Sequence, residues 1–291
     1  MERLDPHAGR APWSRAFRAR AVLAVLALAV TAAWAAPAQR EGVEVGEASS
    51  LARLVPAAEV ENSAKQQYHQ LLQQASARHA LAGPEHPQLK RLQAISQRLI
   101  PQSLAWNERA RTWQWEVNLV GSNQVNAFCM PGGKIAVFTG IIDKLHLTDD
   151  ELAMVLGHEM AHALREHARE RMGKSAVTQG GLRIGGALIA GLFGFDPHMT
   201  DFVARGAANL LTLKFSRGDE SEADLVGMEI AARAGYDPRA AITLWQKMAQ
   251  ASKGAPPEWL STHPSGDSRI SELRKNLPRV LPLYERTQVR K

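Results

Sequence analysis

His158-Glu159-Met160-Ala161-His162 is the stretch that decides how this 291-residue chain is interpreted. It lies within residues 151–170, whose acidic beginning and apolar spacing predict a single helix. Thr148 followed by Glu151 is the pattern of a capping box at its start. Two histidines four residues apart project from one face of a helix, so their ring nitrogens can reach one Zn²⁺. The pentad therefore indicates metal-assisted hydrolysis, with Glu159 placed to act on water rather than to bind the metal.

An amphipathic helix can also carry two solvated histidines without any metal, so the pentad needs a third ligand. The metzincin class of zinc protease is excluded, because its motif requires glycine and histidine where this chain has Arg165 and Ala168. His167 is one residue out of register, and we expect it on the surface. Glu220 and Asp224 are better candidates, since they lie four residues apart on a second predicted helix. One carboxylate could bind the metal while the other orients a ligand histidine, the alternative being a solvated acidic face.

The order of the motifs resembles that of one family of zinc peptidases. The pentad is followed by Ser216-Arg217 and then by Glu220 to Asp224, in a Ser-Arg-x-x-Glu-x-Glu-Ala-Asp pattern. Residues 126–140 are similar to the strand segment before the active helix, and Ser261-Thr262-His263-Pro264 is similar to the C-terminal Thr-His-Pro segment. These matches resemble the gluzincin family of HtpX and the CaaX prenyl endopeptidases, above all its periplasmic BepA-like and LoiP-like branch.

The resemblance implies a set of site residues. The ligands of one zinc ion per chain would be His158, His162 and Glu220. Glu159 would be the general base, Asp224 would orient a ligand histidine, and Arg217 would lie behind the ligands. His263 or Arg217 would help to stabilise the oxyanion. In related proteases the equivalent of His263 can approach the zinc and block the site, whereas a histidine that caps the turn at Pro264 is the alternative.

The resemblance also implies a zinc endopeptidase that acts on unfolded or misassembled proteins of the bacterial envelope, in quality control. Substrate backbone could pair with an edge strand, supplied by residues 124–128 or 134–139, which suits extended chains. A zinc aminopeptidase is one alternative. A latent protease that acts mainly as a chaperone or assembly factor is another.

The N-terminus predicts export. Residues 1–38 combine five arginines with an apolar run and small residues for cleavage, which is typical of a signal peptide and places the chain in the periplasm. The run is shorter than the ~20 residues of a spanning helix, and an uncleaved anchor is the alternative. Without the five arginines and two acidic residues of this leader, the net charge falls from +6 to +3. No basic cluster with interleaved aromatic residues is present, which argues against nucleic-acid binding. Cys129, the only cysteine, is expected to be buried and inert.

The expected fold is α+β and mainly helical, a zincin-like catalytic domain with a small sheet over the active-site helix. Residues 39–60 are expected to form an extended linker, and residues 61–291 the metallopeptidase domain. We expect strands at 113–120, 124–128 and 134–139, and further helices at 62–79, 87–100, 216–234, 238–251 and 268–276. The glycine-rich residues 180–194 predict a tightly packed helix, or alternatively a lid or a peripheral membrane contact. The sequence leaves the oligomeric state open.

Overall fold

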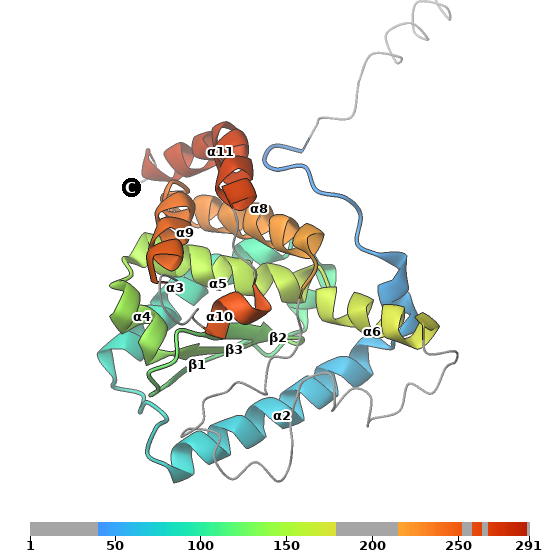
Figure 1. The fold of residues 1–291 in the computed structure, drawn as a ribbon, viewed down its shortest axis with the longest axis vertical. Helices are drawn as coiled ribbons and strands as arrows, with labels where there is room; N and C mark the ends of the chain where they lie inside the picture. The colour runs from blue at the N-terminus through green and yellow to red at the C-terminus, as the bar shows by residue number, and fades with distance from the viewer. Residues whose placement is uncertain (1–39, 179–214, 252–257, 264–266, 290–291) are drawn as a thin grey trace, which may run out of the picture. The chain divides into compact units, whose positions relative to one another are not determined.

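The computed structural model describes residues 40–178, 215–251, 258–263 and 267–289 (Figure 1). The chain divides into two units, Met1–Glu41 and Gly42–Lys291, and the fold described below is that of the second. The signal peptide predicted at 1–38 and the glycine-rich segment at 180–194 lie outside the described residues. Among the helices that are described, none is long and apolar enough to span a bilayer.

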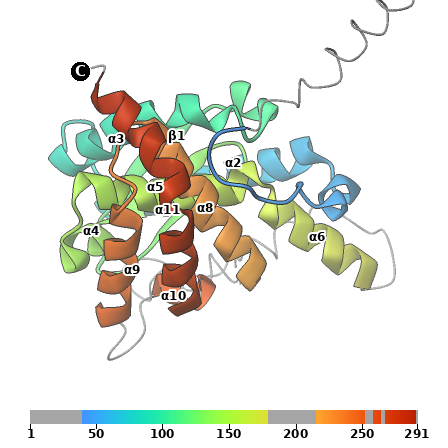
Figure 2. The same ribbon diagram turned by 90° about the horizontal axis from the view of Figure 1, so that it is seen from above.

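Most of the described elements are helices, which surround one small sheet. In chain order they are η1 (Ser50–Leu54), α2 (Ala57–Ala77), α3 (Pro87–Ser103), η2 (Glu108–Arg111), β1 (Glu116–Val120), β2 (Ala127–Met130), β3 (Lys134–Phe138), α4 (Thr139–Leu145), α5 (Asp149–Leu164), α6 (His167–Thr178), α8 (Arg217–Arg233), α9 (Ala240–Ala251), α10 (Glu258–Thr262) and α11 (Asp267–Gln288). This arrangement confirms the expected α+β, mainly helical class. Figures 1 and 2 show α11 lying against α8 and α9.

The sheet has the strand order β1-β3-β2, so β3 is its central strand. β1 pairs with β3 in parallel, and β2 pairs with β3 antiparallel. Two strands were predicted as candidates for a free edge. The prediction is wrong for residues 134–139, because β3 is paired on both sides. β2 is an edge strand, and it lies against α5.

The two faces of the sheet bury two separate apolar layers. Successive side chains of a strand point to opposite faces. Ile135 and Val137 accordingly join the core formed with α3 and α5, whereas Ala136 and Phe138 pack against α2. Figure 1 shows the sheet between α5 on one side and α2 on the other. The helix that carries the pentad thus rests on a fully apolar support.

The helix predicted over residues 151–170 is in fact two helices. α5 begins with the predicted capping box, in which the Glu151 amide donates to the Thr148 hydroxyl at 3.2 Å. It ends before Glu166, which has a left-handed φ of +58°. A left-handed residue cannot continue a right-handed helix, so the chain turns there and α6 starts afresh at His167. Neither glycine nor proline occurs at residues 164–167, so the sequence does not indicate this break.

Within the extended linker expected at 39–60, the described residues 40–60 include η1 and the beginning of α2. Val55 and Val60 are fully buried, and η1 packs against α6. A Cβ atom on Gly173 of α6 would lie 2.0 Å from the Leu51 carbonyl oxygen of η1, so a glycine is needed for this contact. The apolar residues of the segment explain the difference, because burying them outweighs the cost of ordering the chain.

Two glycines bring α5 and α8 into backbone contact. A Cβ on Gly157 would lie 2.7 Å from the Gly227 carbonyl oxygen, and a Cβ on Gly227 would lie 2.5 Å from the His158 nitrogen. α8 is the helix predicted at 216–234: Ser216 caps it through a capping box, and Gly235 follows its end with a φ of +83°. The close crossing holds the first turn of α8 above the pentad.

Candidate active site

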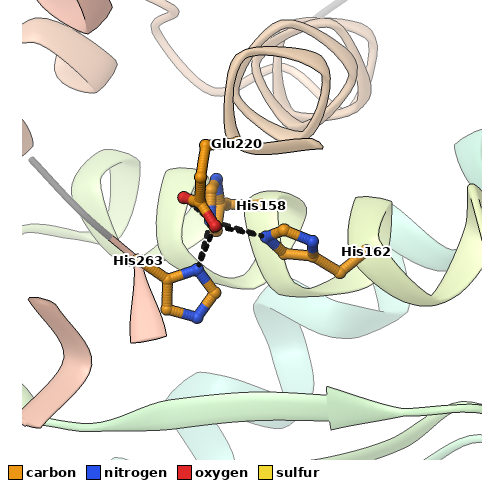
Figure 3. A group of neighbouring side chains, drawn as sticks. All are labelled: His158, His162, Glu220 and His263. Carbon is orange, nitrogen blue, oxygen red and sulfur yellow. Dashed lines mark hydrogen bonds and ion pairs between the residues drawn. The ribbon is translucent and has the colours of Figure 1, made fainter. Parts of the chain in front are cut away.

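Four buried side chains converge where α5, α8 and the residue after α10 meet (Figure 3). They are His158, His162, Glu220 and His263, and one ligand-type atom from each lies within 4.8 Å of the others. The Nε2 atoms of His158 and His162 are 3.1 Å apart, as their i and i+4 spacing predicts. The structure therefore brings together the three predicted ligands and adds His263 to them. We call these four residues the cluster.

The distances and chemistry of the cluster fit a bound zinc ion. Glu220 Oε1 lies 3.5 Å from His162 Nε2, and Oε2 lies 3.6 Å from His158 Nε2. Ligands bound at zinc's usual bond lengths in a tetrahedron stand about 3.3–3.6 Å from one another. Glu220 Oε2 is buried, and Arg269 Nη1 lies 2.6 Å from it. This contact is an ion pair without the alignment of a hydrogen bond. Imidazole and carboxylate together are a donor set that zinc accepts.

Asp224 lies behind His158, at the ring nitrogen that faces away from the cluster. Its Oδ1 is 3.0 Å from His158 Nδ1, which leaves Nε2 directed at the cluster. Arg269 Nε and Nη2 each donate to the Asp224 carboxylate at 2.7 Å. Burial alone raises the pKa of Asp224, but the charges of Arg269 and His158 outweigh it and lower that pKa to about 2. Asp224 is thus an anionic acceptor for the His158 ring.

Arg269 occupies the place that we predicted for Arg217. Arg217 is the first residue of α8 and is exposed, whereas Glu220 on the same helix is buried. A guanidinium at a helix start remains in water unless an acidic partner compensates its desolvation. Arg269 has that compensation from Asp224 and Glu220, and its guanidinium also lies 3.6 Å from the centre of the Trp245 ring. Its position shortly after the Thr-His-Pro segment was the available signal.

Glu159 lies next to the cluster but is held from the opposite side. The Trp259 Nε1–H group donates to Glu159 Oε1 at 2.6 Å, and the Trp259 side chain is fully buried. His263 Nε2 is 3.6 Å from the same oxygen. The carboxylate is therefore oriented by α10 while it remains beside the cluster, where the predicted general base should be.

His263 reaches the cluster with its other ring nitrogen. Its Nδ1 is 3.0 Å from Glu220 Oε1 and 3.2 Å from His158 Nε2. Burial by itself lowers the pKa of His263, but the carboxylates of Glu159 and Glu220 outweigh it and raise that pKa above its ordinary value. The structure thus places this buried residue within the cluster, while Pro264, whose turn it was alternatively expected to cap, lies outside the described residues.

His167 is buried, and the expectation of a surface histidine was wrong. Its Nδ1 lies 2.9 Å from His162 Nδ1, and its Nε2 lies 3.3 Å from Glu222 Oε2. We assumed a continuous helix, on which His167 would point away from His162. The left-handed Glu166 redirects the chain and brings His167 back against the ring of His162.

An apolar cavity adjoins the cluster on the side of Glu159 and His162. Its wall includes Phe128, Cys129 and Met130 of β2, together with Trp113 and Phe215. The Phe215 ring stacks on His162 with 3.9 Å between ring centres. Cys129 is a buried free thiol, as expected, and burial raises its pKa. The cavity therefore runs along the edge strand of the sheet.

This fold and this cluster define a zincin-like metallopeptidase site, with a histidine pentad on one helix and a glutamate on the next. Residues 86–277 match the family model described as Peptidase family M48. The chain belongs to peptidase family M48, which confirms the resemblance seen in the sequence.

Named relatives share this region. The chain is 39% identical over 179 residues to mitochondrial metalloendopeptidase OMA1 of Arabidopsis thaliana, covering 60% of this chain and 34% of that protein. It is 31% identical over 176 residues to the beta-barrel assembly-enhancing protease of Yersinia pestis, covering 56% and 35%. It is 28% identical over 156 residues to metalloprotease LoiP of Escherichia coli, covering 54% and 60%. The chain thus spans between about a third and three fifths of the length of these relatives.

Proposed function

We propose that this chain is a zinc-dependent endopeptidase that cleaves extended segments of misfolded or misassembled proteins in the bacterial envelope. The observation that carries the proposal is the buried cluster with Glu159 beside it. In this proposal His158, His162 and Glu220 are the ligands, and Asp224 and Arg269 hold two of them in place. Relatives that are named metalloendopeptidases support the reaction class.

When bound, zinc supplies a Lewis acid that lowers the pKa of water and polarises the scissile carbonyl. The side chains of the protein perform the proton transfers. Glu159 takes a proton from the attacking water and delivers it to the leaving amine. Trp259 keeps the Glu159 carboxylate in position through its 2.6 Å hydrogen bond. We assign to His263, whose Nε2 lies 3.6 Å from Glu159 Oε1, the role of hydrogen-bond donor to the developing oxyanion.

Two features support an extended substrate. β2 is an edge strand, and a peptide that pairs with it presents alternate side chains to the same face. The apolar cavity lies beside that strand and could take an apolar side chain. Segments that are both extended and apolar are exposed mainly in proteins that have not folded or assembled, which would make such proteins the preferred substrates.

Two observations support a site of action outside the cytoplasm. The arginine-rich, apolar N-terminal residues are typical of an export signal. One relative is named for the assembly of beta-barrels, although other relatives are named mitochondrial proteases. We therefore propose the periplasm as the compartment and misassembled envelope proteins as the partners.

The contacts of His263 favour a second candidate function, a protease that is held latent. Its Nδ1 lies within 3.2 Å of both Glu220 and His158, where an incoming carbonyl would need room. A latent enzyme could serve mainly as a chaperone or assembly factor until His263 is displaced.

Casein cleavage and zinc content test both candidates. The wild-type protein should bind one zinc ion and cut casein, while Glu159→Gln should keep the zinc and lose cleavage by about 10²-fold or more. His263→Ala distinguishes the two candidates, since its activity should fall if His263 assists catalysis and rise if it holds the site shut. His69→Ala, at an exposed histidine, is the matched control and should behave as wild type.

If neither the wild type nor His263→Ala cleaves casein with zinc bound, the protease proposal is wrong. Equal cleavage of N-terminally blocked and free peptides would exclude an aminopeptidase.

A further inference from the structure

The two histidines of the pentad are supported in different ways on their outer sides. His158 Nδ1 faces the carboxylate of Asp224 at 3.0 Å. His162 Nδ1 faces another histidine, His167, at 2.9 Å between their Nδ1 atoms. Both His162 and His167 are buried, so each polar atom needs a partner within the protein. His162 is therefore supported by a series of hydrogen-bonded side chains rather than by one carboxylate.

When His162 binds a cation, the protons on the hydrogen-bonded series His162, His167 and Glu222 have one consistent arrangement. His162 Nε2 faces the cluster and must be free of a proton to bind a cation, so its proton resides on Nδ1. That proton is donated to His167 Nδ1, which must then be an acceptor. His167 in turn carries its proton on Nε2 and donates it to Glu222 Oε2 at 3.3 Å. Each ring thereby fixes the tautomer of the next.

Glu222, the last member of this hydrogen-bonded series, is held in place by Arg165. Its Nε donates to Glu222 Oε1, and its Nη2 donates to the Gly46 carbonyl oxygen. Arg165 and His167 flank Glu166, so the left-handed turn at Glu166 places both of them at once. Phe215 stacks on the flat face of His162 and restricts the rotation of that ring. The His162 imidazole is thus held at its edge and on its face.

We infer that His167, fixed by Glu222 and Arg165, is a positioning residue that holds His162 in the tautomer and orientation needed to bind zinc. The inference rests on the proposed ligand set. Outer partners of metal-bound histidines typically contribute 10- to 100-fold to metal affinity. His167 contacts the cluster only through the outer nitrogen of His162 and supplies no ligand atom of its own, so its effect should appear in metal binding before it appears in folding.

Three variants of the full chain test this inference. His167→Leu removes the acceptor and should weaken zinc binding about 10- to 100-fold. His167→Asn keeps an acceptor near the position of Nδ1 and should restore most of that affinity. Glu222→Gln removes the charge behind His167 and should give a smaller loss, and it carries the test if His167→Leu does not fold. Zinc affinity is measured by competition with a chromogenic chelator, and the absorption spectrum of the Co²⁺-substituted protein reports the ligand geometry.

Urea unfolding of the zinc-free proteins separates positioning from general stability. We expect His167→Leu to change the Co²⁺ spectrum while His167→Asn retains it, with a loss of zinc affinity larger than any loss of zinc-free stability. His69→Leu, at an exposed histidine, is the matched control. Wild-type zinc affinity in His167→Leu, or equal losses in His167→Leu and His167→Asn, would overturn the inference. If the wild type itself bound no zinc, the proposed ligand set would fail instead, so the two failures are distinguishable.

Discussion

Gly227→Ala should damage the zinc site from a distance, because Gly227 is where α8 touches α5. The added Cβ would lie 2.5 Å from the His158 nitrogen and 2.6 Å from the Gly157 carbonyl carbon. Unstrained contacts of this kind are about 3.5 Å or longer, so the helices must separate by about 1 Å. Overpacking of this size costs about 1–3 kcal/mol, and the better helix propensity of alanine returns at most about 1 kcal/mol. We therefore expect a net loss of about 1–2 kcal/mol in the free energy of unfolding.

The same displacement should weaken zinc binding. Glu220 lies seven residues before Gly227, about two helical turns away, so a rigid shift of α8 carries its carboxylate along. Zinc–ligand distances in well-formed sites stay within about 0.2 Å of their usual values, which is roughly a fifth of the expected shift. We expect at least a tenfold loss of zinc affinity, equivalent to about 1.4 kcal/mol.

Gly218→Ala is the matched control on the same helix. Among the described residues, a Cβ there would meet only the Ser216 hydroxyl at 3.7 Å, which is an ordinary contact. This variant should be as stable as wild type or up to about 1 kcal/mol more stable, with unchanged zinc affinity. Urea unfolding of the zinc-free proteins and competition with a chelator measure the two quantities. If Gly227→Ala matched Gly218→Ala in both, the backbone contact would not be what positions Glu220.

Two further predictions concern groups beside the cluster. Trp259→Phe removes the donor to Glu159 and should lower kcat for casein about tenfold at unchanged zinc affinity, because a hydrogen bond to a charged group is worth about 1.5–3 kcal/mol; an unchanged kcat would contradict this role. Asp224 has a pKa lowered from 3.8 to about 2 in the folded state, so its contribution is complete above pH 3.8 and is lost as the pH falls toward 2. The zinc-free wild type should therefore lose about 2 kcal/mol more between pH 5 and 2 than Asp224→Asn, and parallel acid unfolding curves would refute the assignment.

The helices that carry the proposed ligands could be predicted because their signals are local. Thr148 with Glu151 and Ser216 with Asp219 are capping boxes that form within one helical turn. The i and i+4 spacing of His158 and His162 then places their Nε2 atoms together without help from the rest of the fold. Propensity and capping decide such features, so a single sequence is sufficient to identify them.

The residues that support the proposed ligands from outside, His167 and Arg269, are placed by long-range geometry. The sequence-based predictions for this part of the site were wrong. His167 contacts His162 only because Glu166 adopts a left-handed conformation, which an ordinary glutamate does not announce. Arg269 reaches Asp224 from α11, 45 residues further along the chain, so no spacing rule connects them. Arg217 lies closer in sequence to the same carboxylates but faces solvent.

A common physical reason connects the correct and the incorrect expectations. The proposed ligand atoms must meet at one point, but three neutral or anionic groups that are buried together need external donors and acceptors to hold their orientation. Those partners come from wherever the fold brings a compensating group: Arg269 behind Glu220 and Asp224, and His167 behind His162. The contact between Gly157 and Gly227 sets the distance at which these partners act. Motifs in the sequence therefore identify the groups that would bind the metal, whereas helix crossings and chain breaks determine how firmly those groups are held.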